Sequence, residues 1–180
     1  SCLEIIIENN YSITGFIDKN KKIENFENFK LLGNDEILLE NKYNDHLYFI
    51  TIGQIKDYKK RLSIFNKLKK LKLKTCIIKS KSAIISKKTS IGLGTIIMRQ
   101  AILNYNSSIG ENCIINNKAL IEHDASIGNN CHISTGSIIN GGVKIGNNVF
   151  VGSGAVIKEG VKIVDNSIIS ANSFIKKDIL

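Results

Sequence analysis

One short segment of the chain carries side chains suited to acid–base chemistry. Glu122, His123 and Asp124 are consecutive. An imidazole titrates near neutral pH, so a neutral histidine can take a proton from an attacking amine or hydroxyl. A neighbouring carboxylate can orient the ring and stabilise the imidazolium that forms. We therefore interpret His123 as a candidate general base and Asp124 as its partner, provided that the surrounding elements leave room for a substrate.

The segment lies inside a strict six-residue repeat. The 96 residues from Ala83 to Asp178 divide into 16 blocks of six without an insertion. The third residue of each block is aliphatic, and the first is Ala, Thr, Ser, Cys or Val. This period fits neither an α-helix nor a free strand, but it fits one side of a triangular coil. The repeat predicts a parallel β-helix in which the aliphatic residues point inward and stack in layers about 4.8 Å apart.

Turn residues recur at fixed places in the blocks. A glycine follows the aliphatic residue in five blocks, and asparagine pairs occupy 129–130 and 147–148. Both residue types accept left-handed backbone geometry, so we expect them to form the corners of the coil. The five glycines are Gly92, Gly110, Gly128, Gly146 and Gly152.

The repeat also predicts the surroundings of His123. It follows the inward-pointing Ile121 by two residues, which places it at an outer corner. One layer is 18 residues, so Gly141 and Gly142 come next to this corner in the following layer. Because glycine has no side chain, we expect open space beside the imidazole.

Residues 1 to 80 predict a different unit, a small parallel α/β domain of Rossmann-like type, with residues 81–180 forming the β-helix domain. We expect a helix within 1–10, a strand over 11–18, a second apolar strand over 46–54 and a helix over 55–74. Asp18 and Gly53 lie near the carboxyl ends of the two strands, where ligands bind in such folds. The apolar face of the second helix is expected to consist of Ile55, Tyr58, Leu62, Phe65 and Leu68.

Composition narrows the class of protein. The formal charge is +9, which suggests an anionic partner, either nucleic acid or a small polyphosphate. No stretch approaches the roughly 18 apolar residues of a membrane span, and the first residues do not resemble a signal peptide, so we expect a cytoplasmic protein. The four cysteines are then expected to be reduced. Cys113 and Cys131 are 18 residues apart and should stack in successive layers as small core thiols.

The chain resembles the bacterial sugar acetyltransferases of the PglD/NeuD family, which modify amino-sugar nucleotides or sialic acid. The resemblance implies a left-handed β-helix. Members of that family begin with a strand and a glycine-rich, His-containing loop, whereas this chain starts inside the following helix. They also commonly end in a proline-containing tail, and this chain has no proline. The segments that carry the resemblance are GFID at 15–18, ITIGQ at 50–54, LIEHDASIG at 120–128 and CHISTGSIINGGVKIGNNVFVGSGAVI at 131–157.

Roles for particular residues follow from the resemblance. It implies general-base catalysis by His123 with Asp124, acetyl-CoA as co-substrate, no metal, and a homotrimer with sites between subunits. By the same match His132, Ser153 and Ala171 lie along the acetyl-CoA groove. Asp18, Lys19 and Gly53 match the contacts to the nucleotide sugar.

The expected reaction is acetylation of the amino group of a UDP-linked 4-amino-4,6-dideoxy-sugar. O-acetylation of sialic acid is the alternative within the family. A structural β-helix without catalytic activity would need neither the His–Asp corner nor the glycine gap. A γ-class carbonic anhydrase would need three converging histidines, and the chain has only His46, His123 and His132, the first of them outside the repeat. Nucleic-acid binding rests on the net charge alone.

Overall fold

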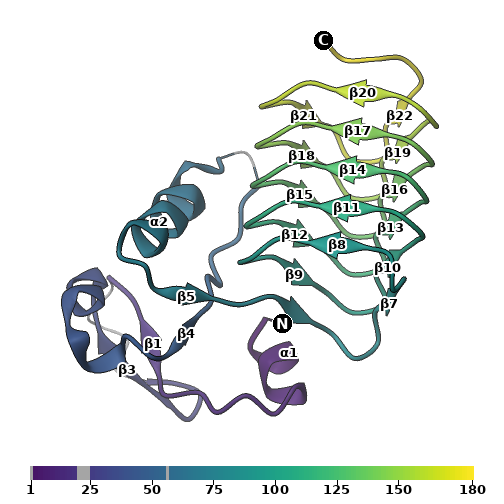
Figure 1. Ribbon diagram of the computed structural model, residues 1–180. Coiled ribbons are helices and arrows are strands. Elements are labelled where there is room, and N and C mark those ends of the chain that lie inside the picture. The colour runs from purple at the N-terminus through teal and green to yellow at the C-terminus, as the bar shows by residue number, and fades with distance from the viewer. Residues whose placement is uncertain (1, 20–24, 56) are drawn as a thin grey trace.

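The repeat forms a three-sided coil of parallel strands, the left-handed β-helix that was predicted (Figure 1). The computed structural model describes residues 2–19, 25–55 and 57–180. Face 1 consists of β6 (Ile78–Lys79), β9 (Ile96–Ile97), β12 (Ile114–Ile115), β15 (His132–Ile133), β18 (Phe150–Val151) and β21 (Ile168–Ile169). Face 2 consists of β7 (Ile84–Ile85), β10 (Ile102–Leu103), β13 (Leu120–Ile121), β16 (Ile138–Ile139), β19 (Val156–Ile157) and β22 (Phe174–Ile175). Face 3 consists of β8 (Ser90–Ile91), β11 (Ser108–Ile109), β14 (Ser126–Ile127), β17 (Lys144–Ile145) and β20 (Lys162–Ile163).

The aliphatic third residues fill the coil as the repeat predicts. Each strand pairs with the strand 18 residues away, so that Ile121 is the register partner of both Leu103 and Ile139. The third residue is buried in every block from Ile97 to Ile169, and the first residue of the block lies in the same core in most of them. Stacked branched side chains and the inter-coil hydrogen bonds therefore stabilise the same register.

The corners differ from the prediction in which residue makes the turn. From Gly94 to Asn172 the sixth residue of every block has a positive φ, including Asn130 and Asn148 as expected. The glycines after the aliphatic residues do not have positive φ, so the prediction for them was wrong. They are needed because the coils approach closely: a Cβ on Gly128 would lie 2.6 Å from the backbone of Gly146.

Cys113 and Cys131 lie in successive coils, as their spacing predicts. Both are fully buried free thiols, and the amide of Cys131 donates to the Cys113 sulfur at 3.4 Å. Contact with Cys113 and burial raise the pKa of the Cys131 thiol. Both residues therefore act as small core side chains.

The N-terminal unit forms two small sheets instead of the predicted single parallel sheet. Its helices are α1 (Cys2–Glu8), α2 (Lys59–Lys70) and the 3₁₀ helices η1 (Asp35–Leu39) and η2 (Asn41–Tyr43). Its strands are β1 (Phe16–Ile17), β2 (Asn25–Phe26), β3 (Phe29–Gly33), β4 (Leu47–Tyr48) and β5 (Lys74–Thr75). β1 pairs with β3, which belongs to a hairpin that the sequence reading missed, and β4 pairs with β5.

Helix α2 is shorter than predicted and buries a different set of side chains. Phe65 and Leu68 are buried as expected. Ile55 precedes the helix and is 65% exposed, so its assignment to the apolar face was wrong. Arg61 is instead buried on this face.

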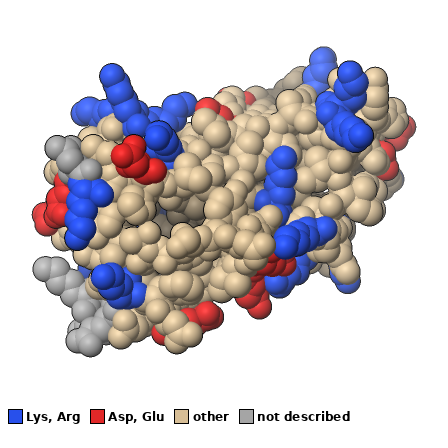
Figure 2. Space-filling view, turned by 60° about the horizontal axis from the view of Figure 1, so that its bottom comes forward, with Lys and Arg blue, Asp and Glu red and all other residues tan. Residues whose placement is uncertain are grey.

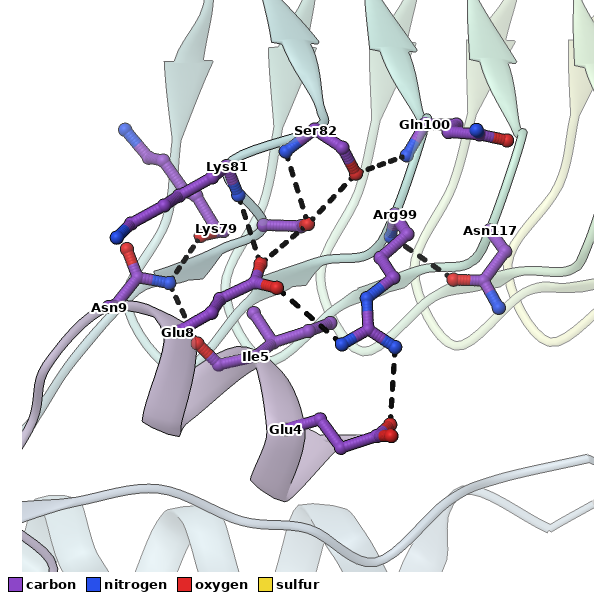
Figure 3. A network of polar contacts seen from close by, with 11 residues as sticks. Glu4, Ile5, Glu8, Asn9, Lys79, Lys81, Ser82, Arg99, Gln100 and Asn117 are labelled. Atoms are coloured by element: carbon purple, nitrogen blue, oxygen red, sulfur yellow. Dashed lines mark hydrogen bonds and ion pairs between the residues drawn. The ribbon is translucent and has the colours of Figure 1, made fainter.

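Helix α1 joins the N-terminal unit to the first coils through a buried isoleucine and a polar network (Figure 3). Ile5 packs on Ile78 and Ile96 of face 1. The Glu8 carboxylate accepts from the Ser80 hydroxyl at 2.7 Å and from the Lys81 amide, and Arg99 pairs with both Glu4 and Glu8. The Ser80 hydrogen bond is the main cause that lowers the pKa of Glu8, so the network is strongest when this carboxylate is charged.

Candidate active site

The His123–Asp124 pair forms at the corner between faces 2 and 3, directly after β13. The ring Nδ1 lies 2.9 Å from Asp124 Oδ2, and the Asn106 side chain donates to Asp124 Oδ1 at 2.7 Å. These two hydrogen bonds, first that of Asn106, lower the pKa of Asp124, so the carboxylate is charged at neutral pH. Asp124 also has φ 60°, the left-handed conformation that Asn106, Gly142 and Gly160 adopt at the same place in other coils. One residue therefore makes the turn and orients the imidazole, with Nε2 as the ring nitrogen left to take a proton.

Gly141 allows the imidazole to lie against the next coil. A Cβ at this position would come within 2.9 Å of both His123 Cε1 and Nε2, whereas a Cβ on Gly142 would meet nothing within 4 Å. The predicted space beside the imidazole is therefore present. The ring fills the part next to Gly141, and the part next to Gly142 is open. The His123 side chain is 65% exposed. It borders an open groove of about 690 Å³ lined by Glu122, His123, Asp124, Asn140, Gly141, Gly142, Glu159 and Gly160.

The groove is acidic, although the chain as a whole is basic. Its lining includes the carboxylates of Glu122, Asp124 and Glu159 and no Lys or Arg. Asn104 donates to Glu122 at 2.8 Å, and Lys158 lies 3.6 Å from Glu159. Sequence reasoning missed Glu159, although its spacing of 18 residues from Gly141 placed it beside this corner. On the face shown in Figure 2, Lys and Arg stand in separate groups with carboxylates between some of them.

His132 occupies the outward side of face 1, but it is buried beneath the N-terminal unit. Only 8% of the residue is exposed. Its Nδ1 donates to the backbone carbonyl of Gln54, and its Nε2 accepts from the Asn116 amide at 3.2 Å. Burial is the main cause that lowers the pKa of His132, so the ring is neutral at neutral pH. His132 therefore contacts the N-terminal unit and not solvent.

The remaining predicted site residues lie away from His123 within one chain. Ser153 and Ala171 are exposed at the corner between faces 1 and 2. Asp18, Lys19 and Gly53 are exposed in the N-terminal unit, where Lys19 lies 3.8 Å from Asp35. Figure 1 shows this unit beside face 1, with the strands of face 2 on the opposite side of the coil. A single chain therefore does not bring the three groups together.

The described ranges contain neither a cluster of metal ligands nor a membrane-spanning helix. Within residues 2–19, 25–55 and 57–180, no three His, Cys, Asp or Glu side chains converge as metal ligands would. None of the helices in those ranges combines the length and the apolar character that crossing a bilayer requires.

Solved structures share the whole architecture. PerB from Caulobacter crescentus, determined with CoA and GDP-perosamine, has a TM-score of 0.90 at 24% identity, over 99% of this chain and 84% of that one. The acetyltransferase domain of PglB from Neisseria gonorrhoeae has a TM-score of 0.90 at 22% identity, over 99% and 86%. WeeI from Acinetobacter baumannii has a TM-score of 0.73 at 19% identity, over 95% and 85%. At these identities the likeness establishes the fold.

Two family models match separate parts of the sequence. The PglD N-terminal domain matches residues 1–68, and the bacterial transferase hexapeptide model matches 106–141, 124–159 and 142–177. No curated protein matches the chain significantly. The N-terminal unit and the coil are thus each identified independently of the structural likeness. The chain belongs to the hexapeptide-repeat proteins that carry a PglD N-terminal domain.

Proposed function

We propose that the protein transfers an acetyl group from acetyl-CoA to the amino group of a nucleotide-linked amino-sugar, in the cytoplasm where both substrates are available. The UDP-linked 4-amino-4,6-dideoxy-sugars are our first choice of acceptor. The observation that carries this proposal is the imidazole of His123, held by a charged Asp124 against Gly141 at the edge of an open groove. The names of solved relatives, a perosamine N-acetyltransferase among them, support the same reaction class.

The geometry fits general-base catalysis. The sugar ammonium first loses a proton to solvent. The neutral amine then attacks the thioester carbonyl carbon, and His123 Nε2 takes the proton that the nitrogen loses. The negative charge of Asp124 stabilises the imidazolium that results. The tetrahedral intermediate then collapses, the C–S bond breaks, and the His123 imidazolium donates its proton to the departing thiolate of coenzyme A, which restores the neutral ring. The products are the N-acetylated sugar and free coenzyme A.

The acidic lining of the groove favours an amine acceptor over sialic acid. An amino-sugar arrives largely as an ammonium ion, which the carboxylates of Glu122, Asp124 and Glu159 attract. Sialic acid carries a carboxylate on the sugar that must enter the groove, where the same groups repel it. The diphosphate of a nucleotide-linked amino-sugar would instead lie toward Asp18, Lys19 and Gly53, outside the groove. We therefore propose N-acetylation and treat O-acetylation as the competing outcome.

A panel of acceptors tests this proposal. Release of coenzyme A is measured with a UDP-linked 4-amino-4,6-dideoxy-sugar, with GDP-perosamine and with sialic acid. We expect one of the two amines to react at least about fivefold faster than sialic acid, since a single opposed charge near the site is worth about 1 kcal/mol or more. Acetylation of sialic acid alone would contradict the proposal, and no release with any acceptor would favour a non-catalytic protein.

We further propose that the active protein is a homotrimer, because the site residues of one chain lie at different corners. The outward residues of face 2 support this arrangement. They form an unbroken apolar stripe, whereas face 3 presents serine and lysine, and such a stripe is typical of an interface between subunits. The stripe consists of Ile84, Ile102, Leu120, Ile138, Val156 and Phe174, with Ile84 64% exposed. Acetyl-CoA would then lie along Ser153 and Ala171 of one subunit and reach His123 of a neighbouring subunit, and the nucleotide would contact Asp18, Lys19 and Gly53.

The stripe can be tested by a single charge. Ile138→Glu places a carboxylate among Leu120 and Val156, its neighbours on face 2. We expect sedimentation velocity to show a trimer for the wild type and a monomer for this variant, with activity lost. Lys144→Glu on the exposed outer side of face 3 is the control and should remain trimeric. A wild-type monomer at micromolar concentration would overturn the proposed assembly.

A further inference from the structure

The corner between faces 3 and 1 presents a column of backbone carbonyls that the coil does not use. At this corner the amide of each sixth residue donates to the fifth residue of the preceding coil, as Asn112 does to Leu93 and Asn130 to Glu111. The carbonyls of Gly94, Asn112 and Asn130 accept no hydrogen bond from any backbone amide of the described residues. A buried carbonyl without a partner destabilises a fold, so these three need donors from elsewhere.

The N-terminal unit supplies those donors from two side chains. Arg61 of α2 donates from Nη2 to Gly94 O at 3.1 Å and from Nε to Asn112 O at 3.4 Å. The Gln54 side-chain amide donates to Asn130 O in the next coil. The two side chains thus pair with three successive carbonyls, and this pattern defines one position of the unit along the coil.

The same guanidinium also holds the segment that precedes the helix. Arg61 Nη1 donates to Ile50 O at 2.6 Å and to Ile52 O at 2.8 Å. His132 donates to Gln54 O from the coil side. Segment 50–54 is therefore held at every second carbonyl. Arg61 binds those of Ile50 and Ile52, and His132 binds that of Gln54.

Arg61 is charged in this position, and no carboxylate in the part of the chain that the structure describes forms an ion pair with it. The residue is 1% exposed, and all four acceptors are backbone carbonyls. Burial is the main cause that lowers its pKa to about 10, which still leaves the group protonated at neutral pH. Burying a charge is unfavourable unless several dipoles face it. The planar guanidinium can meet carbonyls of two elements at once, whereas a lysine ammonium cannot cover the same spread of directions.

We propose that Arg61 is a positioning residue for the acceptor substrate: it fixes segment 50–54, and with it Gly53, at one place against the coil. The proposal rests on the proposed function, in which Gly53 meets the nucleotide sugar. Gly53 itself is exposed and has open space around it, so its place depends on the residues on either side. Those residues, Ile52 and Gln54, are the ones that Arg61 and His132 bind.

The test compares Arg61→Lys with Arg99→Lys, the same change at the chain's other arginine, which lies in the exposed pairs with Glu4 and Glu8. Hydrogen–deuterium exchange of peptides covering 47–54 should rise at least about tenfold in Arg61→Lys, with peptides of the coil beyond residue 137 unchanged. The KM for the UDP-linked 4-amino-4,6-dideoxy-sugar should rise at least about tenfold. The KM for acetyl-CoA and the kcat should stay within about threefold, and Arg99→Lys should leave all of these values unchanged.

Gln54→Ala provides a second, milder variant in case Arg61→Lys unfolds the N-terminal unit. It removes one donor to Asn130 O and should move the same two quantities in the same direction by a smaller factor. Unchanged exchange over 47–54 in both variants would overturn the proposal, and so would a fall in kcat without a change in the sugar's KM. The exchange measurement needs no turnover, so faster exchange in a protein that acetylates nothing would contradict the proposed function while supporting the role of Arg61 in placing the segment.

Discussion

Replacing His123 with alanine is expected to lower the rate of acetyl transfer by about 10²–10⁴-fold with little change in thermal stability. The side chain stands at an exposed corner outside the aliphatic stack, so its removal leaves no cavity in the coil. Only the proton-transfer step should become slower. Steady-state kinetics with the best acceptor of the panel, together with a melting curve, separate these two effects. The KM for the acceptor should remain close to that of the wild type.

Two neighbouring variants make the expected result for His123 more specific. Asp124→Asn keeps a residue that tolerates positive φ but removes the charge that stabilises the imidazolium, so its rate should fall less than that of His123→Ala. Gly141→Ala would place a methyl group against the ring and should also slow transfer. An alanine variant at position 123 that turned over normally with every acceptor would refute both the catalytic assignment and the mechanism.

Ile121→Ala should have the opposite effect, a loss of about 2–5 kcal/mol in the free energy of unfolding without removal of a chemical group. Ile121 lies in the same block as His123 but is fully buried between Leu103 and Ile139. Alanine would leave a cavity that the stacked coils, fixed by their hydrogen bonds, can close only in part. Urea unfolding followed by circular dichroism measures the change.

Tyr105→Ala is the control for Ile121→Ala. It removes a larger side chain from an exposed corner one coil away and should cost well under 1 kcal/mol. If both variants unfolded at the same urea concentration as the wild type, the aliphatic stack would not be the main source of the coil's stability.

The sequence alone determined the coil and the position of His123 on it. A period of six with an aliphatic third residue allows one geometry, and in that geometry residues 18 apart must be neighbours. From this followed the buried stack, the contact of Cys113 with Cys131, and the placement of Gly141 beside the imidazole. Each of these features depends on local spacing. Because the repeat length is constant, the same spacing holds in every coil.

The tertiary structure decided the features that depend on contacts between distant segments. The glycines after the aliphatic residues were assigned to turns, but close approach of the coils explains them. No local pattern shows that β1 pairs with β3, since β1 is only two residues long and carries no alternation of its own. Arg61 and His132 are polar residues, which sequence reasoning would place on the solvent-exposed surface. They are buried because each donates to backbone carbonyls across the contact between the two units: Arg61 to carbonyls of the coil, and His132 to the carbonyl of Gln54. These hydrogen bonds can form only after both units have folded.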